Sequence, residues 1–166
     1  MQEKVRGLRV LATPGCIVLV IGFSVMGYLL LRLLISSNFQ SEPNTAAITV
    51  SAPETAVPAG EPFLVSVRIR NSIDDEQNLH SIDISSDYLA SIPLQDSSPG
   101  YNREVTIPFV GFQSFQYTAA VRGRDVRIVE LTFIGEQPGV YTGELDVCIN
   151  SGTICKLFPL STTIGE

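Results

Sequence analysis

Two cysteines near the end of the chain have the spacing that most directly suggests chemistry. Cys148 and Cys155 enclose residues 149–154, which contain the turn-forming run Asn-Ser-Gly. Cysteines that face each other across a hairpin can meet the Cα separation that a disulfide needs. We therefore expect a bridge here, which stabilises so short a loop by about 2–3 kcal/mol. Leu145 and Val147 take the inward parity of the strand, so the bridge is expected on the outer surface.

A pair of thiolates that binds Cu(I) or exchanges disulfides is the alternative interpretation of these two cysteines. No methionine or histidine cluster lies beside them in the sequence to complete a copper site. We favour the structural bridge, and we predict no catalytic residue, no metal ligand and no cofactor for this chain.

The other candidate ligands are His80, the only histidine, and the acidic run Asp-Asp-Glu at residues 74–76. A lone histidine forms no zinc or blue-copper site without several further ligands, and most histidine-dependent hydrolase mechanisms are disfavoured for the same reason. The acidic run would bind Ca²⁺ only with oxygen ligands from other loops, such as Asp96 or Asp125. Nothing in the spacing requires this, so we predict a solvated loop.

Three arginines, Arg122, Arg124 and Arg127, form the one basic cluster of an acidic region. Gly123 lies between the first two, which favours a turn on which guanidinium groups bind a carboxylate or an acidic patch of a partner. The alternative is that these arginines balance neighbouring acidic residues of the same domain.

A long uncharged segment indicates where these residues are placed in the cell. Residues 10–31 carry no charged side chain, and as a helix they would span roughly 33 Å, close to the thickness of a hydrocarbon core. If Arg32 snorkels, the apolar run extends to residue 35. We therefore predict a transmembrane helix at residues 10–35, kept as a signal anchor because its apolar run is too long for a cleaved signal peptide.

The charges that flank this segment predict its orientation. Basic residues within residues 1–9 precede it, whereas no base lies between Arg32 and Arg68. Positive flanks stay inside, so we expect a cytoplasmic tail at residues 1–9, a location in the plasma (inner) membrane and a periplasmic or extracellular C-terminal domain. From residue 38 onward there are 16 acids and 7 bases, a net charge of −9, so nucleic acid is an unsuitable partner.

Small residues within the predicted helix suggest that it contacts other helices. Gly22, Ser24 and Gly27 would let helix backbones approach closely, although their spacing is not that of a GxxxG motif. Cys16, in the same segment, is expected to act as a small apolar residue. We therefore expect subunits of a membrane complex as partners.

The rest of the chain has the pattern of an all-β domain. After a polar linker at residues 36–47, apolar residues alternate with polar ones, most clearly at residues 63–70. The other expected segments are a charged loop at 71–78, a strand at 79–86, a loop with a short edge strand at 87–102, and strands at 103–110, 112–121, 126–134 and 156–164. Seven to eight strands without a helix predict an antiparallel sandwich over residues 48–166.

Two stretches within this region resemble a known class of domain. The sequences VPAGEPFLVSVRIRN at residues 57–71 and QPGVYTGELDVCI at residues 137–149 are similar to strands of bacterial extracytoplasmic Ig-like domains of the fibronectin type III or CARDB kind. The resemblance implies an immunoglobulin-like sandwich. It also places Tyr141 at the tyrosine-corner position, with its hydroxyl bonded back to nearby backbone.

These observations favour a non-catalytic, single-pass accessory or structural subunit of a membrane complex, whose exported Ig-like domain makes protein–protein contacts. The alternative is a surface-displayed adhesion or ligand-binding module. A metal-delivery or assembly factor is a third possibility, and it depends on Cys148 and Cys155 alone.

Overall fold

The computed structural model describes residues 42–166. The cytoplasmic tail, the transmembrane helix and most of the linker that we predict lie outside the described residues, as do Cys16, Gly22, Ser24 and Gly27. Within residues 42–166, no helix has the length and apolar character needed to cross a membrane.

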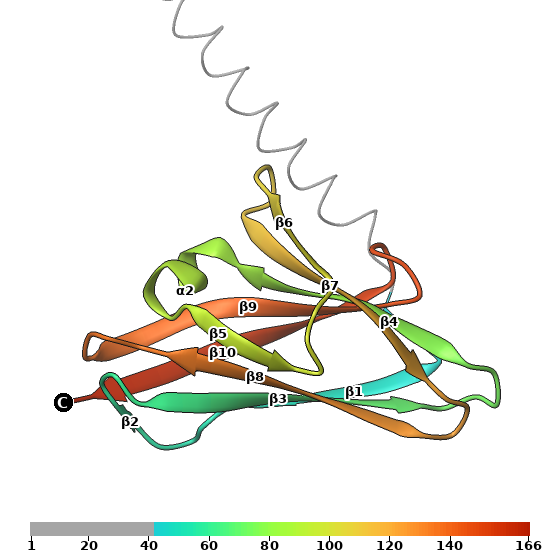
Figure 1. Cartoon of the computed structure of the whole chain (residues 1–166), viewed down its shortest axis with the longest axis horizontal. Helices are drawn as coiled ribbons and strands as arrows, with labels where there is room; N and C mark the ends of the chain where they lie inside the picture. The colour runs from blue at the N-terminus through green and yellow to red at the C-terminus, as the bar shows by residue number, and fades with distance from the viewer. Residues whose placement is uncertain (1–41) are drawn as a thin grey trace, which may run out of the picture. The chain divides into compact units, whose positions relative to one another are not determined.

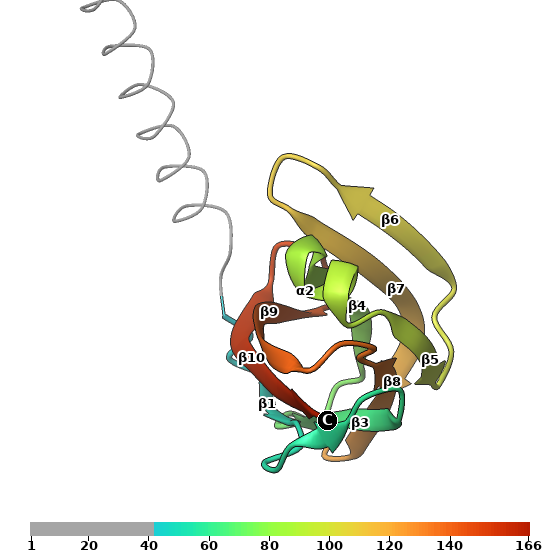
Figure 2. The same ribbon diagram turned by 90° about the vertical axis from the view of Figure 1, so that its left-hand side faces the viewer.

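Two β-sheets face each other across one hydrophobic core (Figures 1 and 2). The four-stranded sheet has the order β1 (Ala46–Ser51), β3 (Pro62–Asn71), β8 (Val126–Ile134) and β5 (Leu94–Ser98). The six-stranded sheet has the order β2 (Val57–Pro58), β10 (Cys155–Gly165), β9 (Gly139–Ile149), β4 (Gln77–Ser85), β7 (Phe112–Val121) and β6 (Arg103–Ile107). All neighbours pair antiparallel except β2 and β10. The described region is therefore an all-β sandwich, as the sequence predicts.

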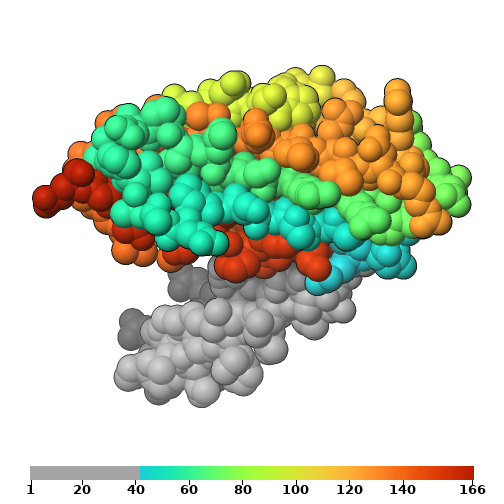
Figure 3. All heavy atoms as spheres, turned by 90° about the horizontal axis from the view of Figure 1, so that it is seen from below, coloured from blue at the N-terminus to red at the C-terminus, as the bar shows by residue number. Residues whose placement is uncertain are grey.

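The alternation of residue types explains why β3 and β8 form the centre of the four-stranded sheet. Val65 and Val67 of β3 are fully buried, and they pair with Leu131 and Val129 of β8, which are buried as well. Residues of the opposite parity face outward, and Figure 3 shows β8, β3 and β1 forming one continuous face. A period of two with one apolar parity produces this half-buried arrangement.

A short helix, α2 (Ser86–Ser91), closes one end of the core and was not expected from the sequence. Its Tyr88 is buried, packs edge-on against Phe133 and shares a hydrogen bond of 2.7 Å with the Thr162 hydroxyl. Gly143 of β9 makes room for it, because a Cβ there would lie 2.5 Å from the Cβ of Tyr88. The helix forms because Tyr88 fills space between the sheets, a tertiary reason that six residues of sequence do not reveal.

Two further expectations about the strands need correction. The described residues form ten strands instead of seven or eight, and the two-residue β2 is too short to give a periodic signal. β5 is the short edge strand expected within residues 87–102. The strand expected at residues 103–110 ends at Ile107, where Pro108 begins the turn that leads into β7. Proline lacks the backbone N–H that a strand would donate, so pairing stops there.

The expected charged loop at residues 71–78 contains a buried hydrogen-bonded centre. The Asn71 side chain donates to the backbone carbonyls of Asp75 and Val121 and accepts from Gln77 Nε2 at 2.7 Å. Gln77 also donates to the carbonyl of Thr45. The side-chain amides of Asn71 and Gln77 thus connect β3, β4 and β7 with the segment just before β1, although the sequence places both residues in a loop. Buried polar groups need such partners.

Candidate functional site

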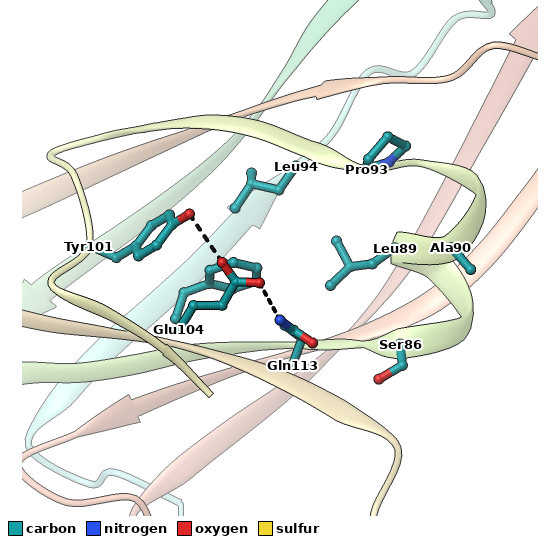
Figure 4. A pocket seen from close by; sticks show the side chains of 9 residues that line it. Ser86, Leu89, Ala90, Pro93, Leu94, Tyr101, Glu104 and Gln113 are labelled. Atoms are coloured by element: carbon teal, nitrogen blue, oxygen red, sulfur yellow. Dashed lines mark hydrogen bonds between the residues drawn. The ribbon is translucent and has the colours of Figure 1, made fainter. Parts of the chain in front are cut away.

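An open groove of about 320 Å³ lies between α2 and the β6–β7 hairpin (Figure 4). Its lining residues come from α2, the segment that leads into β5, the loop before β6, and the hairpin: Ser86, Leu89, Ala90, Pro93, Leu94, Tyr101, Glu104, Gln113 and Phe115. The lining mixes apolar side chains with the polar groups of Ser86, Tyr101, Glu104 and Gln113.

Glu104 is the acidic residue of the groove, and two neighbours donate hydrogen bonds to its carboxylate. The Tyr101 hydroxyl donates at 3.4 Å, and the Gln113 side-chain amide donates to the other oxygen. Partial burial and the adjacent Glu104 carboxylate together raise the pKa of the Tyr101 hydroxyl. The Tyr101 ring packs edge-on against Phe115, with 5.0 Å between ring centroids. This ring contact and the hydrogen bonds to Glu104 fix the side chains on this side of the groove.

The hairpin beyond Glu104 is unusual in composition and exposure. Residues 105–121 contain no charged side chain, although the domain around them is strongly acidic. At the turn, Phe109 is 89% exposed and Val110 is half exposed. Exposed aromatic side chains on a protruding turn are typical of contact surfaces. Sequence reasoning missed this feature because it assigned these residues to a strand.

The three arginines lie on the β7–β8 turn and at the start of β8. Arg124 lies on the β7–β8 turn, and its guanidinium donates to Asp74 Oδ1 at 2.8 Å and to the carbonyl of Ser72. Arg127 lies on β8 and donates to the carbonyl of Ala120. Two of the three thus make contacts within the domain, and partner contact stays a prediction for all three arginines.

His80 lies within β4, at the point where the register of this strand shifts. Its ring lies beside the β9–β10 turn, since a Cβ on Gly152 would be 3.4 Å from His80 Nε2. The interpretation of His80 as an ordinary strand residue fits this position.

The expected disulfide joins Cys148 and Cys155, which are directly paired across β9 and β10 with a Cα–Cα distance of 4.0 Å. Its expected exposure is wrong, because Cys148 is fully buried and Cys155 is 4% exposed. The parity was assigned correctly: Cys148 alternates with the core residues Leu145 and Val147. A residue of outward parity is not necessarily exposed to solvent, because this face of the six-stranded sheet is buried at Asp146 as well.

Two acidic residues beside this disulfide were not identified as a site from the sequence. Asp83 of β4 and Asp146 of β9 are direct cross-strand partners, and they are 9% and 3% exposed. Asp83 Oδ2 lies 3.7 Å from Cys148 Sγ. Burial raises the pKa of Asp83, while the Ser114 and Ser81 hydroxyls and the charge of His80 lower it in part. The adjacency depends on the pairing of β4 with β9, which the sequence does not specify.

No family model matches the chain, and no curated protein matches it in sequence. Among solved structures, similar folds include the cupredoxin domain of amoB from Nitrosocaldus yellowstonii, at 12% identity and a TM-score of 0.46, over 76% of this chain and 91% of that one. A cohesin module of a Clostridium perfringens family 33 glycoside hydrolase gives 11% identity and 0.46, over 74% and 98%. The PapD-like domain 7 of human CEP192 gives 14% and 0.42, over 76% and 91%.

Proposed function

We propose that this chain is a non-catalytic, single-pass membrane-anchored accessory subunit of a membrane protein complex. Its Ig-like domain, exported beyond the anchor at residues 10–35, binds partner subunits through the β6–β7 hairpin and the groove beside it. The observation that carries the proposal is the turn at Phe109, where a large aromatic side chain is 89% exposed within the uncharged residues 105–121.

An exposed aromatic side chain leaves apolar surface in contact with water, and a partner that binds there would bury this surface. Burial of a phenylalanine side chain is worth about 1.5–3 kcal/mol, and aromatic anchors dominate the energetics of protein interfaces. Residues 105–121 around the turn bear no charge to be desolvated, so a partner can cover them at low cost. Glu104 supplies one polar contact at the edge of the same surface.

The test is a pair of substitutions in the full-length protein, extracted in mild detergent and measured by native sizing. Wild type is expected to elute within an assembly larger than a monomer. Phe109→Asp is expected to weaken that assembly about 30-fold or more, the effect of losing an interface anchor worth about 2 kcal/mol. Val140→Asp is the matched control, because Val140 is an exposed apolar residue on β9.

A monomeric wild type, or equal assembly of the Phe109→Asp and wild-type proteins, would refute the proposal. Replacement of residues 10–35 by an unrelated apolar helix separates it from a displayed adhesion module. An accessory subunit loses assembly in that exchange because its helix contacts partner helices. A displayed adhesion or ligand-binding module keeps its binding, since it requires only attachment to the membrane.

A further inference from the structure

Four potential metal ligands meet on the buried outer face of the six-stranded sheet. The Sγ atoms of Cys148 and Cys155 and a carboxylate oxygen of Asp146 all lie within 4.8 Å of one another. Asp83 approaches the same group from β4, with its Oδ2 at 3.7 Å from Cys148 Sγ. In the oxidised protein the sulfur atoms are bonded to each other and carry no charge.

An unsatisfied oxygen of Asp83 points to a missing ligand. Asp83 is 9% exposed, and its Oδ1 is buried with no hydrogen-bond partner. The hydroxyls of Ser81 and Ser114 face the same side chain, yet neither closes a hydrogen bond to Oδ1. A buried carboxylate oxygen without a donor is costly, and native proteins retain such groups mainly where an ordered water, an ion or a proton completes them.

The pairing of Asp83 with Asp146 also favours a cation at this face of the sheet. The two residues lie directly opposite each other on β4 and β9, where two ionised carboxylates would repel each other. A cation between the two carboxylates would turn this repulsion into attraction.

We propose that reduction of the Cys148–Cys155 disulfide creates a four-ligand site for a borderline-soft divalent cation such as Zn²⁺, formed by both thiolates and the carboxylates of Asp146 and Asp83. Ligand atoms in a tetrahedral zinc site are about 3.3–3.8 Å apart, given bonds of about 2.0–2.3 Å. Here the two sulfur atoms and an Asp146 oxygen lie within 4.8 Å of one another, and Asp83 Oδ2 lies 3.7 Å from Cys148 Sγ. The four side chains would therefore have to shift after the disulfide opens to reach these separations around a cation. Two thiolates with two carboxylates suit Zn²⁺ better than they suit Ca²⁺ or Mg²⁺.

Reduction of the disulfide and binding of the cation are two separate steps. A dithiol reductant transfers two electrons and two protons to the disulfide, which yields two cysteine thiols while the dithiol becomes a disulfide. Binding of the cation then displaces both thiol protons into solvent. The site is therefore closed by oxidation and opened by reduction, so the cation and the disulfide exclude each other.

The experiment uses the full-length chain in detergent with Cys16→Ser, so that Cys148 and Cys155 are the two remaining cysteines. A phosphine reductant avoids competition from dithiols for the metal, and thiol titration verifies that two thiols appear. Co²⁺ is then added as a spectroscopic probe, and Zn²⁺ is added as its competitor. We expect thiolate-to-cobalt absorption in the reduced protein alone, with displacement by Zn²⁺.

Asp83→Asn and Asp146→Asn test the carboxylates, and Asp75→Asn, an exposed acid, is the matched control. Each of the first two is expected to lower the affinity for Co²⁺ about tenfold or more, and the control should leave it unchanged. Asparagine keeps the shape of the side chain and removes a buried charge, so Asp83→Asn is expected to fold.

A second measurement needs no acidic variant. Zn²⁺ should slow the alkylation of Cys148 and Cys155 in the reduced protein. The proposal is overturned if the reduced protein takes up no Co²⁺, if the oxidised protein binds it equally, if neither Asp83→Asn nor Asp146→Asn weakens binding, or if Zn²⁺ leaves alkylation unchanged.

Discussion

At the scale of single residues, Asp83 occupies the environment least suited to its side chain. It is buried, it faces another carboxylate, and its Oδ1 has no hydrogen-bond donor. The sequence indicates only that Asp83 alternates with the apolar Ile82 and Ile84, which places it on the outward parity. Whether an outward residue meets solvent depends on what covers the sheet, and the alternation carries no information about that.

Tyr117 shows the opposite case, a buried polar group with a well-placed partner. Its hydroxyl lies 2.8 Å from Ser97 Oγ, which itself donates to the carbonyl of Pro99, so the tyrosine is the donor. The bond joins β7 of one sheet to β5 of the other. Burial raises the pKa of Tyr117 to about 12.

This raised pKa predicts how stability depends on alkaline pH. Unfolded tyrosine ionises near pH 10, so from about pH 10 to 12 the unfolded chain loses a proton that the folded chain keeps. The contribution of Tyr117 is therefore fully present below about pH 10 and is lost as the pH rises through about 12, with a slope of up to about 1.4 kcal/mol per pH unit.

Tyr117→Phe should lower the free energy of unfolding by about 1 kcal/mol at neutral pH, because the hydrogen bond is lost. Above pH 10, the free energy of unfolding of this variant should decline less steeply than that of the wild type. Urea unfolding at a series of pH values measures both effects. Tyr141→Phe is the control, because the Tyr141 hydroxyl bonds to the carbonyl of Gln137 at the exposed surface. If Tyr117→Phe and wild type lose stability in parallel above pH 10, the assignment to Tyr117 is wrong.

At the scale of elements, the β7–β8 turn is determined by one close approach of two backbones. A Cβ added to Gly123 would lie 1.8 Å from the carbonyl oxygen of Asp74. The same turn holds Arg124 at a φ of 61°, and its N–H donates to the carbonyl of Ile73. The loop after β3 and the turn after β7 can pack this closely only where position 123 has no side chain.

Gly123→Ala should therefore destabilise the domain strongly, by about 2–4 kcal/mol, since a rigid backbone stands in the way of the new methyl group. Gly100→Ala is the matched control, because its added Cβ would meet only the carbonyl of Ser97 at 3.9 Å. Thermal unfolding of both variants measures the difference. Equal melting temperatures of the two variants would mean that the backbones at positions 74 and 123 move apart at little cost in free energy.

Elements with long periodic patterns could be predicted from the sequence, and short ones could not. The alternation along β3 and the inward parity of Leu145 and Val147 in β9 both appear in the structure. The Tyr141 hydroxyl also bonds back to nearby backbone, as the resemblance implied. By contrast, α2 depends on space left by distant strands, and local propensity does not encode that space.

At the scale of the whole molecule, the leading prediction concerns attachment to lipid. The uncharged run at residues 10–31, ahead of the acidic remainder, predicts an integral membrane protein. Alkaline carbonate washing of membranes should leave the full-length chain in the pellet. A variant with two charged residues introduced at Val18 and Val20 should shift into the supernatant, because each charge opposes insertion by about 2.5–3.5 kcal/mol. Release of the unaltered chain would refute the anchor.

The positions at which the chain enters and leaves the sandwich also have a mechanical consequence. Thr45, just before β1, accepts a hydrogen bond from Ser72 at one end of β3, while Gly165 accepts one from Ala59, near the other end. A pull between the two ends of the domain would load the β1–β3 ladder along its length. Its six register pairs lie across that direction and must break together instead of one after another. The first strand thus acts as a shear clamp, so the domain is expected to resist stretching more strongly than peeling.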